Sequence, residues 1–152
     1  MWDSLGEHCG WSERVDPSGI RRYDDFLLIV SRWPGTGLEN ETGVGNIFNA
    51  TLKAGTTSKE FNAIFEQKIL NAIDKFKPEI ILISAGFDAH KRDPLANISL
   101  ESDDFFKITK NIVDIANTHS NGRIISFLEG GYDLQALSES IIEHLNALKP
   151  HI

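Results

Sequence analysis

The chain has 152 residues, of which 41% are hydrophobic and 24% are charged, and its formal net charge is −7. This length suits one domain, and no stretch has the roughly 20 apolar residues that a membrane span requires. The chain is acidic and has no run of basic residues, so nucleic acid is not expected as a direct ligand. The single cysteine excludes an internal disulfide and a CxxC metal site. The N-terminus does not resemble a secretion signal, so a cytoplasmic location is expected by default.

The first part of the chain carries few structural signals. Residues 1–32 show no clear periodicity, and we expect a loop or a segment unrelated to the rest, except for a first strand at residues 24–31. A glycine-rich connection follows at residues 32–46. It lacks the Lys-Ser/Thr of a phosphate-binding Walker loop and the GxGxxG of a dinucleotide site, which favours a structural loop.

Residues 58–76 are predicted to form an amphipathic helix. Ser58 is a suitable N-cap and Pro78 ends the helix. The apolar residues recur at steps of three and four along this segment, and they are Phe61, Ile64, Phe65, Ile69, Leu70, Ile73 and Phe76.

Two apolar runs predict strands at residues 79–87 and 123–128. The first run is so apolar that it predicts a central strand buried on both faces. A helix from Ser102 to about Asn121 separates the strands, and a third helix runs from Asp133 or Leu134 towards Pro150. This alternation predicts an α/β fold with a parallel sheet, in which functional side chains lie beyond the carboxyl ends of the strands.

Asp88 and His90 follow the first strand directly. Residues two apart in extended chain point the same way, and a carboxylate with an imidazole suits zinc. Two ligands do not make a catalytic zinc site, and Asp88 could equally cap its own loop. The histidines His119, His144 and His151 are expected to be solvated.

Asp93 and Tyr132 also lie near the predicted strand ends. For Asp93, we favour a carboxylate that caps backbone N–H groups of its own loop. Tyr132 follows two glycines, and packing and catalysis are equally compatible with that position.

Three segments together resemble a known family. They are SAGFDAHKRDPLA at 84–96, GRIISFLEGGYDL at 122–134, and PGTG with E-x-G-x-G-x-x-x-N at 34–49. They resemble the zinc-dependent histone deacetylases and acetylpolyamine amidohydrolases, most closely the class II and bacterial branch, over about residues 33–148. The resemblance implies a three-layer α/β/α fold of the arginase/deacetylase type, with residues 33–152 forming the C-terminal part of that domain.

The resemblance also implies roles for individual residues. Asp88 matches a zinc ligand, and Tyr132 matches the tyrosine that donates a hydrogen bond to the substrate carbonyl. Gly130 and Gly131 would leave room for the acyl-lysine channel. His90 matches a position that the family does not use as a ligand, which weakens the Asp88-x-His90 metal pair.

The chain departs from the family pattern in its first part. It contains no His-His pair, residues 1–32 lack the Asp-x-His zinc motif, and Trp33 replaces the usual tyrosine before PGTG. We therefore expect the C-terminal part of a deacetylase for acetyl-lysine peptides or acetylpolyamines, inactive as this chain alone. Such a part should associate with itself, bind a missing N-terminal half, or be marginally stable. Two alternatives are a non-catalytic assembly or binding module and an arginase-like ureohydrolase, whose Asp-rich metal motifs are not seen.

Overall fold

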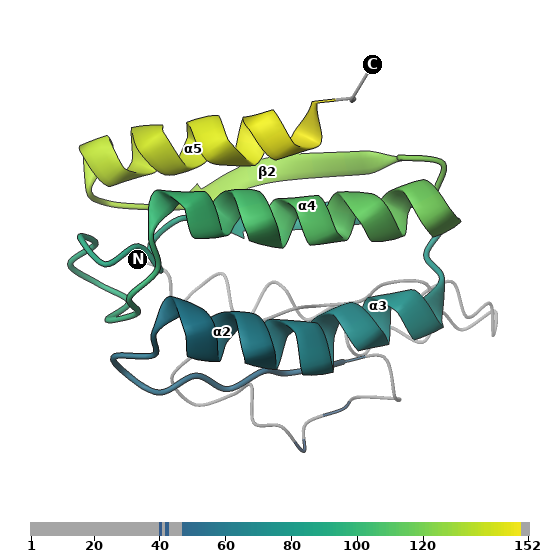
Figure 1. Cartoon of the computed structure of the whole chain (residues 1–152), viewed down its shortest axis with the longest axis horizontal. Helices are drawn as coiled ribbons and strands as arrows, with labels where there is room; N and C mark the ends of the chain where they lie inside the picture. The colour runs from purple at the N-terminus through teal and green to yellow at the C-terminus, as the bar shows by residue number, and fades with distance from the viewer. Residues whose placement is uncertain (1–39, 41, 43–46, 150–152) are drawn as a thin grey trace, which may run out of the picture.

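The computed structural model describes residues 40, 42 and 47–149 (Figure 1). The predicted strand at residues 24–31 and the whole of residues 1–32 lie outside the described residues. The elements in chain order are α2 (Ser58–Ile64), η1 (Phe65–Leu70), α3 (Asn71–Phe76), β1 (Ile81–Gly86), α4 (Ser102–His119), β2 (Ile124–Gly130) and α5 (Leu134–Leu148).

Helical structure covers residues 58–76 as predicted, with π-helical hydrogen bonding over η1 in the middle. The N-cap is Thr57 and not Ser58. The Thr57 hydroxyl accepts a hydrogen bond from the Glu60 N–H, and the Glu60 carboxylate accepts one from the Thr57 N–H at 2.9 Å, which completes a capping box. The Ser58 hydroxyl instead donates to the Asp104 carboxylate on α4, so it joins the starts of two helices.

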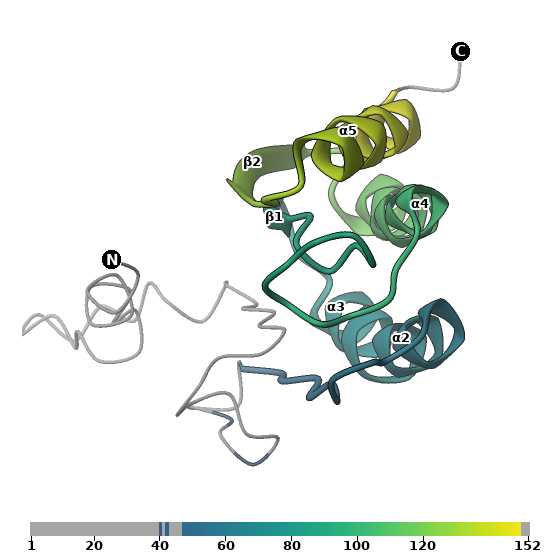
Figure 2. The same cartoon turned by 90° about the vertical axis from the view of Figure 1, so that its left-hand side faces the viewer.

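Among the described residues the sheet contains β1 and β2, which pair in parallel from Ile81 opposite Ile124 to Gly86 opposite Gly130. The register is irregular between Ala85 and Gly86. Helix α4 connects the two strands, because parallel strands need a long crossover. Figure 2 shows α3, α4 and α5 on the same side of β1 and β2.

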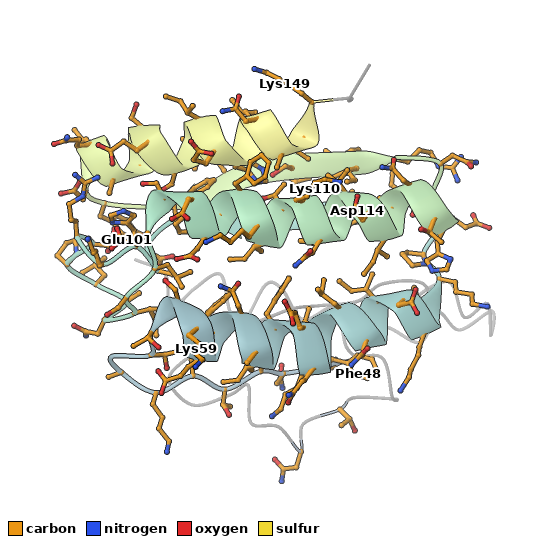
Figure 3. All side chains as sticks on the ribbon, viewed as in Figure 1. Phe48, Lys59, Glu101, Lys110, Asp114 and Lys149 are labelled. Carbon is orange, nitrogen blue, oxygen red and sulfur yellow. The ribbon has the colours of Figure 1, made fainter. Side chains whose placement is uncertain are left out.

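The core lies between the sheet and this helix layer. One group of buried side chains centres on Ile69 and Ile112, and a second centres on Phe87 and Leu100. Ile83 of β1 packs against both groups, so the inner face of the sheet joins them. On the opposite face of α4, Lys110 and Asp114 form an ion pair (Figure 3).

The other face of the sheet is open among the described residues. Leu82 and Phe127 are 47% and 53% exposed, and Ile125 is exposed beside them. The prediction that the first strand is buried on both faces is therefore wrong for the part of the chain that the structure describes. The reason is that the described helices cover one face only, while the side chains of each strand alternate between faces. No helix within the described ranges is long and apolar enough to cross a membrane.

Candidate active site

Asp88 lies at the carboxyl edge of the sheet, immediately beyond β1. The Phe87 N–H donates a hydrogen bond to the Gly130 carbonyl at 2.9 Å, so this stretch stays paired with the end of β2. A Cβ added to Gly130 would stand 3.4 Å from the Asp88 Oδ1 atom, and one added to Gly86 would stand 3.0 Å from it. The carboxylate therefore lies against two glycine positions, one at the end of each strand.

The surroundings of Asp88 disfavour its charge. Partial burial raises the pKa of the Asp88 carboxyl, a hydrogen bond from its own backbone lowers it, and the nearby charge of Asp93 raises it. No ion pair to Asp88 is found among the described residues. A partly dehydrated carboxylate without a cationic neighbour suits a metal ion, since the ion would supply the missing positive charge.

The described residues do not form a complete zinc site. Among them, no three His, Cys, Asp or Glu side chains gather into a metal-binding group. A catalytic zinc takes about three protein ligands. The chemistry of the Asp88 carboxylate fits one of these ligands.

Tyr132 lies on the loop that follows β2, at the same edge of the sheet as Asp88. The Tyr132 N–H donates a hydrogen bond to Asp93 Oδ2 at 2.7 Å, and its side chain is 46% exposed. The preceding Gly131 has φ +131°, and a Cβ there would meet Leu137 Cδ1 at 2.8 Å and Phe87 Cβ at 3.2 Å. Glycine thus lets this loop pack directly on Phe87, the residue before Asp88.

The two glycines before Tyr132 face different surroundings. The space beside Gly131 is filled by Leu137 and Phe87, whereas Gly130 faces the Asp88 carboxylate. A contribution of Gly130 and Gly131 to a substrate channel stays a prediction.

His90 does not form a metal pair with Asp88. It is 2% exposed, its Nδ1 atom accepts a hydrogen bond from the Arg92 N–H at 3.1 Å, and its Nε2 atom lies 3.3 Å from the Ser102 hydroxyl. Burial, followed by the charge of Arg92, lowers the pKa of the His90 imidazole. Since both ring nitrogens have protein partners, His90 fixes the loop and leaves no nitrogen for a metal.

The sequence predicts a solvated His144, and this prediction is wrong. It is buried between α4 and β2, with Nδ1 2.7 Å from the Thr109 hydroxyl and Nε2 2.9 Å from the Ser126 hydroxyl. His119 is partly buried and pairs with Asp74 at 2.8 Å, and His151 lies outside the described residues. The two hydroxyl partners of His144 come from other elements, so no local sequence signal identifies them.

Comparison with known proteins identifies the family. Residues 26–148 match the model of the histone deacetylase domain. The chain belongs to the histone deacetylase family. The resemblance inferred from the sequence motifs is therefore confirmed, and so is the arginase/deacetylase-type α/β fold with its parallel sheet.

Two relatives and one solved structure of this deacetylase-family chain show the extent of the similarity. It is 38% identical to histone deacetylase 14, chloroplastic, of Arabidopsis thaliana, over 82% of this chain and 31% of that protein. It is 31% identical to the histone deacetylase-like amidohydrolase of Pseudomonas aeruginosa, over 84% of this chain and 37% of that protein. The crystal structure of the HDA15 HD domain matches 80% of this chain and 37% of its own, with a TM-score of 0.73 and 28% identity. The chain thus spans less than half the length of these relatives.

Proposed function

We propose that this chain supplies part of the active site of a zinc-dependent deacetylase that hydrolyses acetyl-lysine or acetylpolyamine amides. The observation that carries the proposal is the placement of Asp88 and Tyr132 on the loops after two paired strands, at one edge of the sheet. Membership of the histone deacetylase family supports the reaction class.

In this proposal Asp88 is a metal ligand and Tyr132 stabilises the reacting carbonyl. Zinc, when bound, would polarise the amide carbonyl and lower the pKa of a bound water. A phenol has an ordinary pKa near 10, so it keeps its proton at about pH 7 and can donate a hydrogen bond to an oxyanion. The partial exposure of Tyr132 leaves its side chain accessible to a substrate.

We further propose that the 152-residue chain alone does not hydrolyse amides. No three candidate zinc ligands gather among the described residues, and the sequence has no His-His pair to move protons. An assembly or binding module with the same fold is the alternative, and it predicts that Asp88→Ala and Tyr132→Phe change nothing measurable.

The first experiment uses the chain itself. Zinc titration by calorimetry and a fluorogenic acetyl-lysine assay are expected to give weak zinc binding and no turnover. Tight stoichiometric zinc binding together with turnover would overturn the proposed inactivity.

The second experiment tests the deacetylase proposal directly. In a chimeric enzyme, residues 33–148 of this chain replace the matching part of the Pseudomonas amidohydrolase. The rates of hydrolysis of acetyl-lysine and acetylpolyamine substrates by this chimera are compared. We expect Asp88→Ala to remove bound zinc, and Tyr132→Phe to lower kcat by about 10²–10³-fold with zinc retained. Asp103→Asn, an exposed acid on α4, is the control. A chimera that is inactive, or that is unaffected by both substitutions, would refute the proposal.

A further inference from the structure

Asp93 connects the two loops at the candidate site. Its Oδ1 atom accepts a hydrogen bond from the Leu95 N–H at 3.0 Å, and its Oδ2 atom accepts one from the Tyr132 N–H at 2.7 Å. The residue is 9% exposed. The bond to Leu95 is the loop cap that the sequence favours, whereas the bond to Tyr132 crosses 39 residues of chain.

The Asp93 side of this connection is anchored to the helix layer. The Asp93 N–H donates to the His90 carbonyl at 2.8 Å, and the buried His90 ring lies against Ser102 at the start of α4. The Leu100 N–H also donates to the Ala89 carbonyl at 3.1 Å, which ties the same loop to the residues before α4. Several hydrogen bonds therefore hold the loop that carries Asp93 in place.

The Tyr132 side is fixed on both of its flanks. Gly131 packs between Phe87 and Leu137, and the Asp133 carboxylate accepts a hydrogen bond from the Ala136 N–H at 2.7 Å to cap α5. Between these neighbours, the N–H of Tyr132 has the Asp93 carboxylate as its acceptor. This bond restricts the peptide plane from which the Tyr132 side chain projects.

We propose that Asp93 is a positioning residue for Tyr132: its carboxylate holds the Tyr132 peptide in place at the carboxyl edge of the sheet, on the loop that follows β2. The consequence for catalysis rests on the proposed function, whereas the effect of Asp93 on Tyr132 does not. An aspartate is suited to this task because its two oxygens accept two N–H groups at once, and a charged acceptor makes short hydrogen bonds.

The test uses the full 152-residue chain labelled with ¹⁵N-tyrosine. The sequence has two tyrosines, Tyr23 and Tyr132, so the spectrum contains an internal reference, and Tyr132→Phe assigns the two signals. Asp93→Asn keeps the shape of the side chain but replaces one of the two acceptor oxygens with an NH₂ donor. We expect the Tyr132 amide signal to shift and its hydrogen exchange to accelerate by about tenfold or more, with Tyr23 unchanged.

Asp103→Asn is the matched control and should leave the Tyr132 signal in place. A second measurement needs no substitution: a scalar coupling across the hydrogen bond between the Tyr132 ¹⁵N and Asp93 ¹³Cγ nuclei. The inference is overturned if this coupling is absent, or if Asp93→Asn folds and leaves the Tyr132 amide unchanged. Because neither measurement involves zinc or substrate, an inactive chimera would refute the proposed function without affecting this result.

Discussion

The Asp88 carboxylate lies against the backbone of Gly130, with 3.4 Å between its Oδ1 atom and the place where a Gly130 Cβ would stand. Asp88 follows β1, whereas Gly130 is the last residue of β2 and lies 42 positions (130 minus 88) further along the chain. The end of β2 thus limits where the proposed zinc ligand can lie.

The size of the side chain at position 130 should determine whether the Asp88 carboxylate can keep its position. We expect Gly130→Val in the chimeric enzyme to weaken zinc binding by about 10- to 100-fold, because the added methyl groups occupy the space of the carboxylate. Gly130→Ala is the control, since its Cβ makes ordinary contact with Asp88. Metal content and a competitive zinc titration measure the effect, and equal affinities for the two variants would contradict the prediction.

Removing the charge of Asp88 should stabilise the metal-free chain. Burial raises the folded-state pKa of this carboxyl, so the ionised form is less favourable in the folded than in the unfolded chain. At about pH 7 we expect Asp88→Asn to raise the free energy of unfolding by on the order of 0.5 kcal/mol, because partial exposure screens the cost. The gain should shrink as the pH falls through the folded-state pKa, and it should vanish below about pH 4, where the carboxyl is protonated in both states.

Urea denaturation of the metal-free chain measures this gain. Asp114→Asn is the control and should not raise the free energy of unfolding, because it removes the exposed ion pair with Lys110 on α4. A loss of stability in Asp88→Asn would indicate that Asp88 is a structural cap.

Acid should destabilise the chain through His144. Burial lowers the folded-state pKa of its imidazole, so the unfolded chain binds a proton more readily. The stability that depends on neutral His144 is present above the unfolded pKa of about 6.5 and is lost as the pH falls through the folded value. His90 acts in the same direction for the same reason.

The pH dependence of the urea midpoint tests this effect. Between about pH 7 and pH 5 the midpoint of the unsubstituted chain should fall, and His144→Gln should show a shallower fall from a lower starting stability. The pH dependence of the urea midpoint in His90→Gln should likewise be shallower than in the unsubstituted chain. An identical slope in His144→Gln and the unsubstituted chain would contradict the assignment.

The open face of the sheet should promote self-association. Leu82, Ile125 and Phe127 form an apolar surface across both strands. We expect Leu82→Gln with Phe127→Gln to shift the chain towards monomer in sedimentation velocity at micromolar concentration. Leu134→Gln, at the exposed start of α5, is the control, and unchanged sedimentation of the double variant would contradict the prediction.

Local signals in the sequence determined most of the helices and strands. The apolar periodicity and the flanking Ser, Gly and Pro residues located the helices at 58–76, 102–119 and 134–148 to within a few residues, because these preferences act over one or two turns. The segments around Asp88 and Tyr132 identified the family because their residue types and order are specific.

The tertiary structure determined the features that depend on contacts between residues far apart in the sequence. The burial of His144 requires hydroxyls from α4 and β2, and the open sheet face depends on which side the helices cover. The bond from Tyr132 to Asp93 joins two loops that only the parallel pairing of β1 and β2 brings together. A sequence pattern reports the preferences of neighbouring residues, and contacts between residues about 40 positions apart are set by how the whole chain packs.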